Sequence, residues 1–362
     1  MPLPVYLAVK EHLDLELNIG GYEAQDRATP AFERTYDAIA ELINCDRSEI
    51  ALVENATVGW QMAFYGIQFK PGDRILTVEA EYATNVISYL QLTERKGITV
   101  DFVPSDNSGQ IDVAALEGMI DDKVKLISVT HIPTNGGLIN PAEAVGKIAR
   151  KHGIPYLLDA CQSVGQIPVD VEQIGCDMLS VTGRKYLRGP RGTGFLYVRK
   201  GFMDELDPPV LDMHSAEWTA LDAYQVRQDA RRFENWEFNT AGIIGLGVAV
   251  DYLLALGIDE TSARLCGLAQ TAREALATVP GITVQDIGAE KGGLVTFDYA
   301  GKSVNDVKAH LTANTINTSI TTISSTRYDL HKRGIENLIR SSFHYYNTEN
   351  EIDRFIEVLK TL

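Results

Sequence analysis

The middle of the chain alternates short apolar runs, rich in β-branched residues, with segments of helical periodicity. We predict strands at Ile50–Val53, Arg74–Val78, Val100–Val103, Val124–Val129, Tyr156–Leu158 and Met178–Val181. The helical segments between them are Ala56–Gly66, Val113–Ile120 and Pro141–His152. This alternation predicts an α/β fold with a mostly parallel central sheet flanked by helices. Ligands of such sheets bind beyond the carboxyl ends of the strands.

The pattern changes after about residue 200. Residues 204–237 are polar, aromatic-rich and poorly periodic, which favours a long excursion over a surface or a subunit interface. Residues 241–256 predict a buried helix, and the remainder predicts a smaller α/β unit. Its helices are expected at 260–279, 303–313 and 349–361, and its strands near 293–298, 318–323 and 337–343. We therefore predict a large domain over 16–240 and a small C-terminal domain over 241–362, on which residues 1–15 pack.

Composition excludes several classes of protein. A formal net charge of −16 over 362 residues argues against a nucleic-acid surface, although a small anionic substrate stays possible. The four cysteines are scattered without ligand spacing, so we expect no disulfide framework, no metal site and a reducing cytoplasm. The start lacks the basic region of a signal peptide, and no apolar run approaches the roughly 20 residues that cross a bilayer.

Two charged residues follow strands of the predicted sheet. Lys185 lies in Gly183-Arg184-Lys185, just after the strand that ends near Val181, and Asp159 follows Leu158 directly. This pair suits an enzyme that uses pyridoxal phosphate. The lysine forms an imine with the cofactor's aldehyde, and the acid keeps the pyridine nitrogen protonated. The alternative for Asp159 is that it only caps the segment that follows.

A third strand end suits an anion. Asn55-Ala56-Thr57-Val58-Gly59 opens a helix with small and hydroxyl residues, and the free amides of a helix N-terminus attract a phosphate. An ordinary helix cap would give the same pattern. Thr182 and Arg184 beside the lysine add a hydroxyl and a cation that can reach the same phosphate. Because three segments converge on one anion, a phosphate-binding site is favoured over an ordinary helix cap.

Three more polar residues are placed near strand ends. Gln162 can contact the cofactor's phenolic oxygen, and His131 can stack on its ring, although a lone histidine is more often structural. Arg340 in the C-terminal unit is suited to clamp a substrate carboxylate, although a lone arginine is usually solvated at the surface.

The chain resembles the class V aminotransferase family of fold type I pyridoxal phosphate enzymes, which includes the cysteine desulfurases. The motifs that carry the resemblance follow in order: Asp159–Gln162, Gly183–Lys185 with Gly189–Gly192, Arg340–Ser342, Tyr346–Thr348 and Glu351–Asp353. The resemblance implies that Lys185 is the imine lysine, Asp159 the pyridinium partner, Gln162 the phenolate contact, His131 the stacked ring and Arg340 the carboxylate clamp. It places the phosphate cradle on Ala56, Thr57, Thr182 and Arg184, and implies a homodimer with active sites at the interface.

Departures from the family pattern carry information too. Arg184 stands where the desulfurases usually have a histidine, and it can still serve a phosphate. Glu237 stands where the family commonly supplies a threonine to the neighbouring subunit's phosphate, which puts that contact in doubt. The loop 323–329 contains no cysteine, whereas a desulfurase needs a thiolate there to accept sulfur. Direct desulfuration of cysteine is therefore not expected.

Within the family, residues 19–24 and 183–190 are most similar to the ergothioneine-pathway carbon–sulfur lyase, and the C-terminal segment is similar to the cystine lyases. We therefore predict a C–S β-lyase that acts on an L-cysteine S-conjugate or its S-oxide, of the hercynylcysteine sulfoxide type, to give pyruvate and ammonia. The alternatives are an aminotransferase or amino-acid epimerase on the same scaffold, and a catalytically silent binding protein. The candidate residues on the substrate side are Tyr22, Tyr82, Asn85, Asn135 and Arg327.

Overall fold

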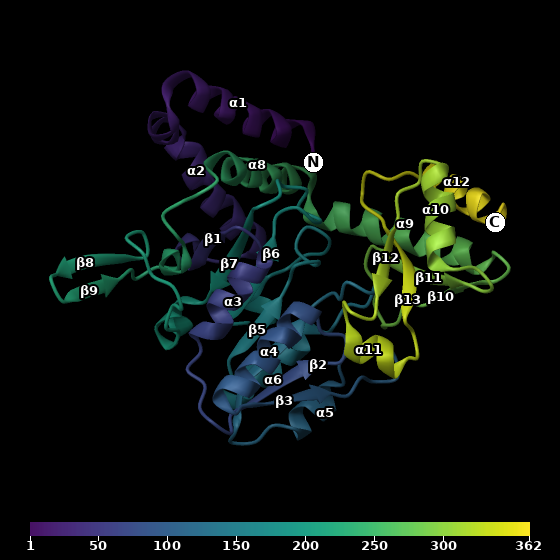
Figure 1. Cartoon of the computed structure of the whole chain (residues 1–362), viewed down its shortest axis with the longest axis horizontal. Coiled ribbons are helices and arrows are strands. Elements are labelled where there is room, and N and C mark those ends of the chain that lie inside the picture. The colour runs from purple at the N-terminus through teal and green to yellow at the C-terminus, as the bar shows by residue number, and fades with distance from the viewer.

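The computed structural model describes every residue from Met1 to Leu362, and its centre is a seven-stranded sheet (Figure 1). The strand order is β1-β7-β6-β5-β4-β2-β3, and only β7 runs antiparallel to its neighbours. The prediction of a mostly parallel sheet is confirmed. The strands are β1 (Ile50–Val53), β2 (Arg74–Val78), β3 (Thr99–Val103), β4 (Val124–Thr130), β5 (Tyr156–Asp159), β6 (Met178–Thr182) and β7 (Gly194–Val198).

Helices cover both faces of this sheet because its central strands are apolar on both sides. Leu158 packs with one buried cluster and its neighbour Leu157 with another, as the alternation of side chains along a strand requires. The first cluster includes side chains of helices α2, α5, α6 and α8, and the second includes those of α3 and α4. The helices that follow the first five parallel strands are α3 (Ala56–Gly66), α4 (Ala83–Lys96), α5 (Val113–Gly118), α6 (Ala142–His152) and α7 (Val171–Ile174).

The N-terminal helices pack on α8 (Thr240–Leu256). Both α1 (Leu3–Ile19) and α2 (Gly21–Ile43) contact it, and the buried face of α8, including Leu246, belongs to the core of the large sheet. After α8 the chain bends by 84° into α9 (Ile258–Ala277). We therefore propose that the boundary between the two units falls at Gly257 rather than at residue 241. No single helix is long and apolar enough to cross a membrane.

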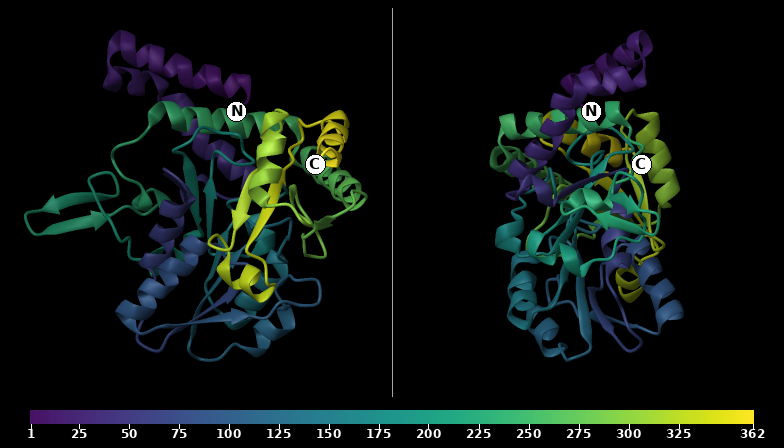
Figure 2. Two further views of the ribbon diagram at one scale, coloured as in Figure 1. Left: turned by 45° about the vertical axis from the view of Figure 1, so that its right-hand side comes forward. Right: turned by 90° about the vertical axis from the view of Figure 1, so that its left-hand side faces the viewer.

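The smaller unit, residues 258–362, is built on an antiparallel sheet of order β10-β11-β13-β12 (Figure 2). Its core joins Leu268 of α9, Phe297, Ile339 and Phe355. The segment predicted as a loop before Arg340 contains a short helix, α11. The elements after α9 are β10 (Ile282–Val284), β11 (Leu294–Tyr299), α10 (Val304–Ala313), β12 (Ser319–Thr322), α11 (Arg327–Lys332), β13 (Asn337–Ser342) and α12 (Glu349–Lys360).

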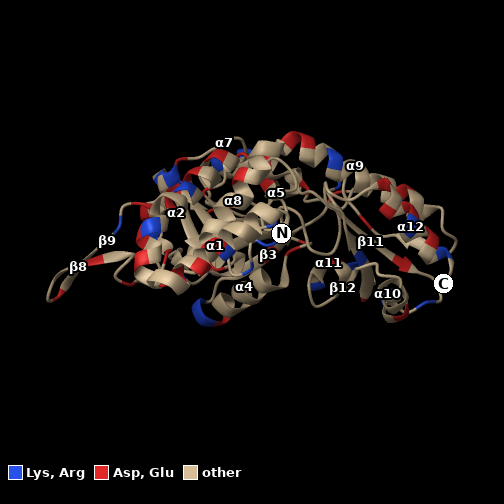
Figure 3. Ribbon diagram, turned by 90° about the horizontal axis from the view of Figure 1, so that it is seen from above, with Lys and Arg blue, Asp and Glu red and all other residues tan.

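The segment between β7 and α8 forms a projecting hairpin of β8 (Ala216–Ala220) and β9 (Ala223–Val226), which stands away from the body in Figures 1 and 2. Trp218, Leu221 and Tyr224 of this hairpin are exposed. In the view of Figure 3, acidic and basic residues are interspersed along the outer helices. Three short 3₁₀ turns complete the chain, at Arg47–Glu49, Lys200–Glu205 and Ala230–Phe233.

Candidate active site

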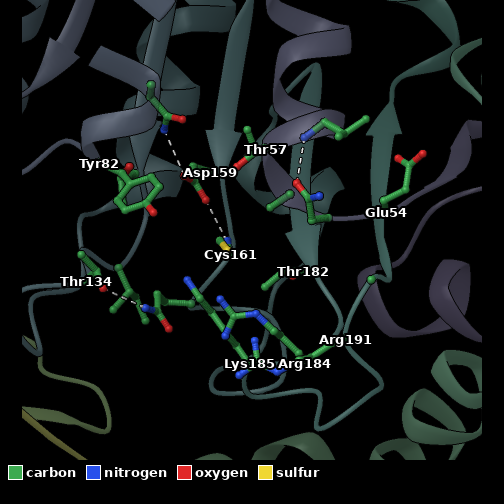
Figure 4. Close-up of a pocket in the computed structure, with 18 residues that line it drawn as sticks. Glu54, Thr57, Tyr82, Thr134, Asp159, Cys161, Thr182, Arg184, Lys185 and Arg191 are labelled. Carbon is green, nitrogen blue, oxygen red and sulfur yellow. Dashed lines mark hydrogen bonds between the residues drawn. The ribbon is translucent and has the colours of Figure 1, made fainter. Parts of the chain in front are cut away.

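A cavity of about 550 Å³ opens beyond the carboxyl ends of the parallel strands (Figure 4). Its size falls in the range of small-molecule sites. It is lined from the start of α3, the turn before α4, and the ends of β4, β5 and β6. Of the residues predicted from the sequence, the structure brings together Ala56, Thr57, Tyr82, Asn85, Asp159, Gln162, Thr182, Arg184 and Lys185.

Lys185 lies in a tight turn between β6 and β7. The Gly183 amide donates to the Thr193 carbonyl, and the Gly189 amide donates to the Gly183 carbonyl, both at 2.8 Å. A side chain at Gly183 would collide with the Thr193 hydroxyl, so the close crossing of the two segments needs glycine there. The turn leaves the Lys185 side chain half-buried in the pocket, beside Cys161 and without an ion pair inside the chain.

Asp159 ends β5 in register with Thr130 of β4 and Ser180 of β6. Its carboxylate is 6% exposed and accepts hydrogen bonds from Asn85 Nδ2 and from the Cys161 amide, both at 3.0 Å and both drawn in Figure 4. It forms no ion pair within the chain. A buried carboxylate that has only neutral donors is stabilised by a cationic partner, and a protonated pyridine nitrogen is such a partner. The floor of the pocket therefore fits pyridoxal phosphate.

The opposite end of the pocket suits a phosphate. Asn55 caps α3, accepting from the Val58 amide at 3.1 Å, and the first turn of a helix leaves other amides without intrahelical partners. Ala56 and Thr57 stand on this turn, and Figure 4 shows Thr182, Arg184 and Arg191 below it. Arg191 was not predicted. The only sequence signal for it is its place in the glycine-flanked segment that follows Lys185.

His131 is not among the residues that line this pocket. Thr130 and Ile132, on either side of it, line the pocket, whereas His131 lines a second cavity. The ring is 5% exposed, its Nδ1 has no hydrogen-bond partner, and burial lowers its pKa to about 4. His131 directly follows β4, and the stacking role that the resemblance implies for it stays a prediction.

The residues predicted for the substrate side are dispersed. Tyr22 is exposed at the start of α2 and lines a separate cavity with Trp236 and Glu237. Asn135 is buried and donates to Asp329 Oδ2 of α11, and Arg327 begins α11 as an exposed side chain. The pocket of this chain therefore contains none of Tyr22, Asn135 and Arg327.

Arg340 reaches the pocket wall from the smaller unit without lining the pocket itself. Its Nη1 donates to the carbonyl and the hydroxyl of Thr134, at 2.9 and 2.7 Å, and its Nε donates to the Ser319 hydroxyl. Thr134 lines the pocket and lies 3.5 Å from Gln162 Nε2. Burial lowers the pKa of the Arg340 guanidinium. Because Nη2 makes no hydrogen bond within the chain, it is the atom available to a substrate carboxylate.

Comparisons with known proteins give one family. The family model described as aminotransferase class V matches residues 4–355. A probable cysteine desulfurase of Pyrococcus abyssi is 30% identical over 369 residues, which are 100% of this chain and 91% of that protein. The apo structure of a cysteine desulfurase from Thermococcus onnurineus NA1 has a TM-score of 0.93 at 28% identity, over 100% of this chain and 91% of that one.

A further solved structure shares the fold. The cystine C–S lyase C-DES, in complex with its reaction product cysteine persulfide, has a TM-score of 0.90 at 22% identity. The similarity covers 99% of this chain and 94% of that one. Another structure of C-DES holds glycine covalently linked to its pyridoxal phosphate cofactor.

Proposed function

The chain belongs to the class V aminotransferase family and depends on pyridoxal phosphate, and on this premise we propose that it is a carbon–sulfur lyase. It removes a sulfur group from the β-carbon of an L-cysteine S-conjugate or S-oxide, such as a compound of the hercynylcysteine sulfoxide type. One observation carries the proposal. The segment 323–329, next to Arg340 and α11, offers no thiol to accept sulfur.

Pyridoxal phosphate, when bound, supplies an aldehyde that condenses with amino groups and a pyridinium ring that stabilises negative charge on the substrate's α-carbon. Residues of the chain bind the cofactor and transfer the proton. Asp159 holds the proton on the ring nitrogen, and the first turn of α3 binds the phosphate with Thr182 and Arg184. Lys185 Nζ would hold the cofactor's aldehyde in the resting enzyme and, as a free amine, would take the proton from the substrate's α-carbon.

Arg340 Nη2 binds the substrate carboxylate, which turns the bond to the α-hydrogen toward Lys185. Loss of the β-sulfur group with its bonding electron pair then leaves aminoacrylate. Water converts this product to pyruvate and ammonia. A sulfenate is a good leaving group, so the step needs no enzyme thiol.

Cys161 is the one cysteine that lines the pocket, and its environment does not favour a nucleophile. Burial raises the pKa of its thiol, although Lys185 beside it acts in the opposite direction. A nucleophile must be a thiolate, so this thiol is poorly suited to take up sulfur. Its amide donates to Asp159 Oδ1, so Cys161 lies beside the carboxylate that we propose holds the ring nitrogen.

Two relatives support C–S cleavage as the reaction class, since one is named a cysteine desulfurase and another a cystine C–S lyase. We propose further that the enzyme is a cytoplasmic homodimer. The exposed apolar side chains of the β8–β9 hairpin and the cavity lined by Tyr22, Trp236 and Glu237 suit a second copy of the chain. Glu237 is exposed there, which is compatible with a place at a subunit interface.

Incubation with a panel of cysteine S-conjugates and their S-oxides, with L-cysteine as the reference, tests the proposal. We expect equal amounts of pyruvate and ammonia from at least one S-oxide, and little alanine from L-cysteine. Alanine with persulfide from L-cysteine would instead show a desulfurase. An amino-group transfer to a keto acid, or inversion at the α-carbon, without pyruvate from any conjugate, would show the aminotransferase or epimerase alternative.

A further inference from the structure

Glu81 is a buried acid that the proposed reaction does not use. It lies in the turn between β2 and α4 and is 2% exposed. Its Oε1 accepts from the Tyr82 amide at 2.7 Å, from Asn85 Nδ2 at 2.9 Å and from the Thr130 hydroxyl. Its Oε2 has one partner, the Thr77 hydroxyl at 2.9 Å. The two oxygens therefore have very different surroundings.

Asn85 connects this acid to the floor of the pocket. Its Nδ2 donates to Glu81 Oε1 at 2.9 Å and to Asp159 Oδ2 at 3.0 Å, which uses both amide protons. Asn85 is itself 2% exposed, so water does not compete for these bonds. Glu81 and Asp159 are thus two buried carboxyl groups that share one amide. Two such groups in close proximity do not both ionise readily.

The surroundings decide which of the two keeps a proton. Burial raises the pKa of Glu81 to about 7, and the charge of Asp159 contributes to the rise. The ionisable groups that face Glu81 are Asp159 of β5 and Tyr89 of α4, whose own pKa is raised well above its usual value by burial. Asp159 instead opens into the pocket, where a cationic ring nitrogen favours its charged form. Glu81 Oε2, with a single partner, is the free position for the proton.

We propose that Glu81 is a positioning residue, a neutral acid that fixes the amide of Asn85 so that Asp159 holds the only negative charge beneath the cofactor's ring nitrogen. The Oε2 proton is donated to Thr77, while Oε1 accepts from Asn85. This orientation directs the second Asn85 N–H to Asp159. The inference rests on the proposed role of Asp159 and not on the choice of sulfur substrate.

The substitution Glu81→Gln tests the protonation state. A glutamine keeps the acceptor toward Asn85 and replaces the O–H toward Thr77 with an N–H. We expect E81Q to bind pyridoxal phosphate within about threefold of wild type in a fluorescence titration of the apoprotein. We also expect the absorbance spectrum of the cofactor bound to E81Q at pH 6 to equal that of wild type. A loss of affinity beyond about tenfold would show that a charged Glu81 is needed and would overturn the proposal.

Stability of the apoprotein provides a second readout that does not involve activity. The ordinary pKa of a glutamate here is 4.5, and in the folded chain it is about 7. The unfolded chain therefore loses its proton first, and the wild type loses stability as pH rises through this window. E81Q removes that loss, so its thermal midpoint exceeds that of wild type at pH 8 and matches it at pH 4.5. The same pH dependence in both proteins would overturn the proposal.

The substitution Glu81→Leu tests positioning. It removes both oxygens, and we expect about tenfold weaker cofactor binding together with a shifted pH profile of the cofactor absorbance. N85A should show the same loss, and the double variant E81L/N85A should lose no more than either single change. Additive losses would mean that Glu81 does not act through Asn85. E79Q is the matched control, because Glu79 faces Ser105 and Lys332, and its cofactor affinity should equal that of wild type.

Discussion

The two sides of the pocket are built in different ways. On the cofactor side, Asp159 ends β5 and Lys185 follows the adjacent strand β6. Asn85, on the helix that follows β2, donates a hydrogen bond to Asp159. On the substrate side, Arg340 belongs to the smaller unit and reaches the wall through Thr134. The first side is defined by strand register, and the second by contacts between two cores.

This difference predicts that substitutions on the two sides affect substrate binding and cofactor binding differently. The polar side-chain bonds between the units on the second side include Arg340 to Thr134, Asn135 to Asp329, and Lys332 to Glu79. Each can be lost without disturbing the large sheet. Changes on this side should alter substrate binding and leave cofactor binding intact, whereas changes on the sheet side should affect both.

The substitution Lys185→Ala removes the amine on which the chemistry of the sheet side depends. We expect turnover of any substrate to fall at least about a thousandfold, because both covalent capture of the cofactor and proton transfer need this amine. Borohydride reduction followed by mass spectrometry should attach the cofactor to wild type and not to K185A. Lys200→Ala, at an exposed lysine, is the control. Covalent attachment of the cofactor to K185A at a different lysine would contradict the assignment.

The sheet side is also the part whose predicted residues the structure brings into one pocket. Lys185, Asp159, Thr182 and Gln162 could be placed because each lies near the end of an apolar run, and parallel strands bring such ends to one edge. Glu81 was missed, although Glu79-Ala80-Glu81 follows the predicted strand 74–78 at that same edge. The missing information was burial, which raises the pKa of this acid.

The predicted residues that do not line this pocket show what a local sequence pattern lacks. His131 follows a strand as Asp159 does, but the end of a run does not reveal to which side the chain turns the next side chain. Tyr22, Asn135 and Arg327 depend on how separate elements meet, which no local pattern contains. The helix α8 was predicted to be buried and to open the smaller unit; its apolar sequence does not indicate which of the two cores receives it.

The substitution Arg340→Ala breaks the substrate side. Loss of a charge-assisted bond to the substrate carboxylate should raise KM about 10- to 100-fold, with cofactor affinity unchanged. Arg340→Lys should recover only part of this, because a lysine cannot hold Thr134 and a carboxylate in the same geometry. Arg354→Ala, on α12, is a control within the same unit. A large loss of cofactor binding in R340A would show that the two sides are not separable.

The substitution Asn135→Ala weakens the same side indirectly. It removes the bond to the Asp329 carboxylate of α11 and should raise KM only about two- to fivefold, because this bond positions α11 and does not contact the substrate. Cofactor affinity should stay at the wild-type value. Asn314→Ala removes a comparable bond inside the smaller unit and should leave KM unchanged. An unchanged KM in N135A would mean that the position of α11 does not influence substrate binding.

The smallest expected effect concerns Glu79, which lies with Glu81 in the turn between β2 and α4. Burial acts to raise the pKa of Glu79, but the bonds and charge of Lys332 and the bonds of Ser105 outweigh it and leave the pKa below 4.5. Its contribution to stability is therefore present above pH 4.5 and is lost as pH falls, opposite in sign to that of Glu81.

The substitution Glu79→Gln should lower the free energy of unfolding by about 0.5–1 kcal/mol at pH 7, because Lys332 is largely exposed and solvent screens the pair. The difference from wild type should be smaller at pH 4, because the unfolded acid takes up its proton near pH 4.5, before the folded acid does. Urea unfolding of the apoprotein at both pH values measures it. At pH 8 we expect E79Q to lower the stability and E81Q to raise it. A change of the same sign in both variants would contradict the electrostatic difference between Glu79, at the contact between the units, and Glu81, at the pocket floor.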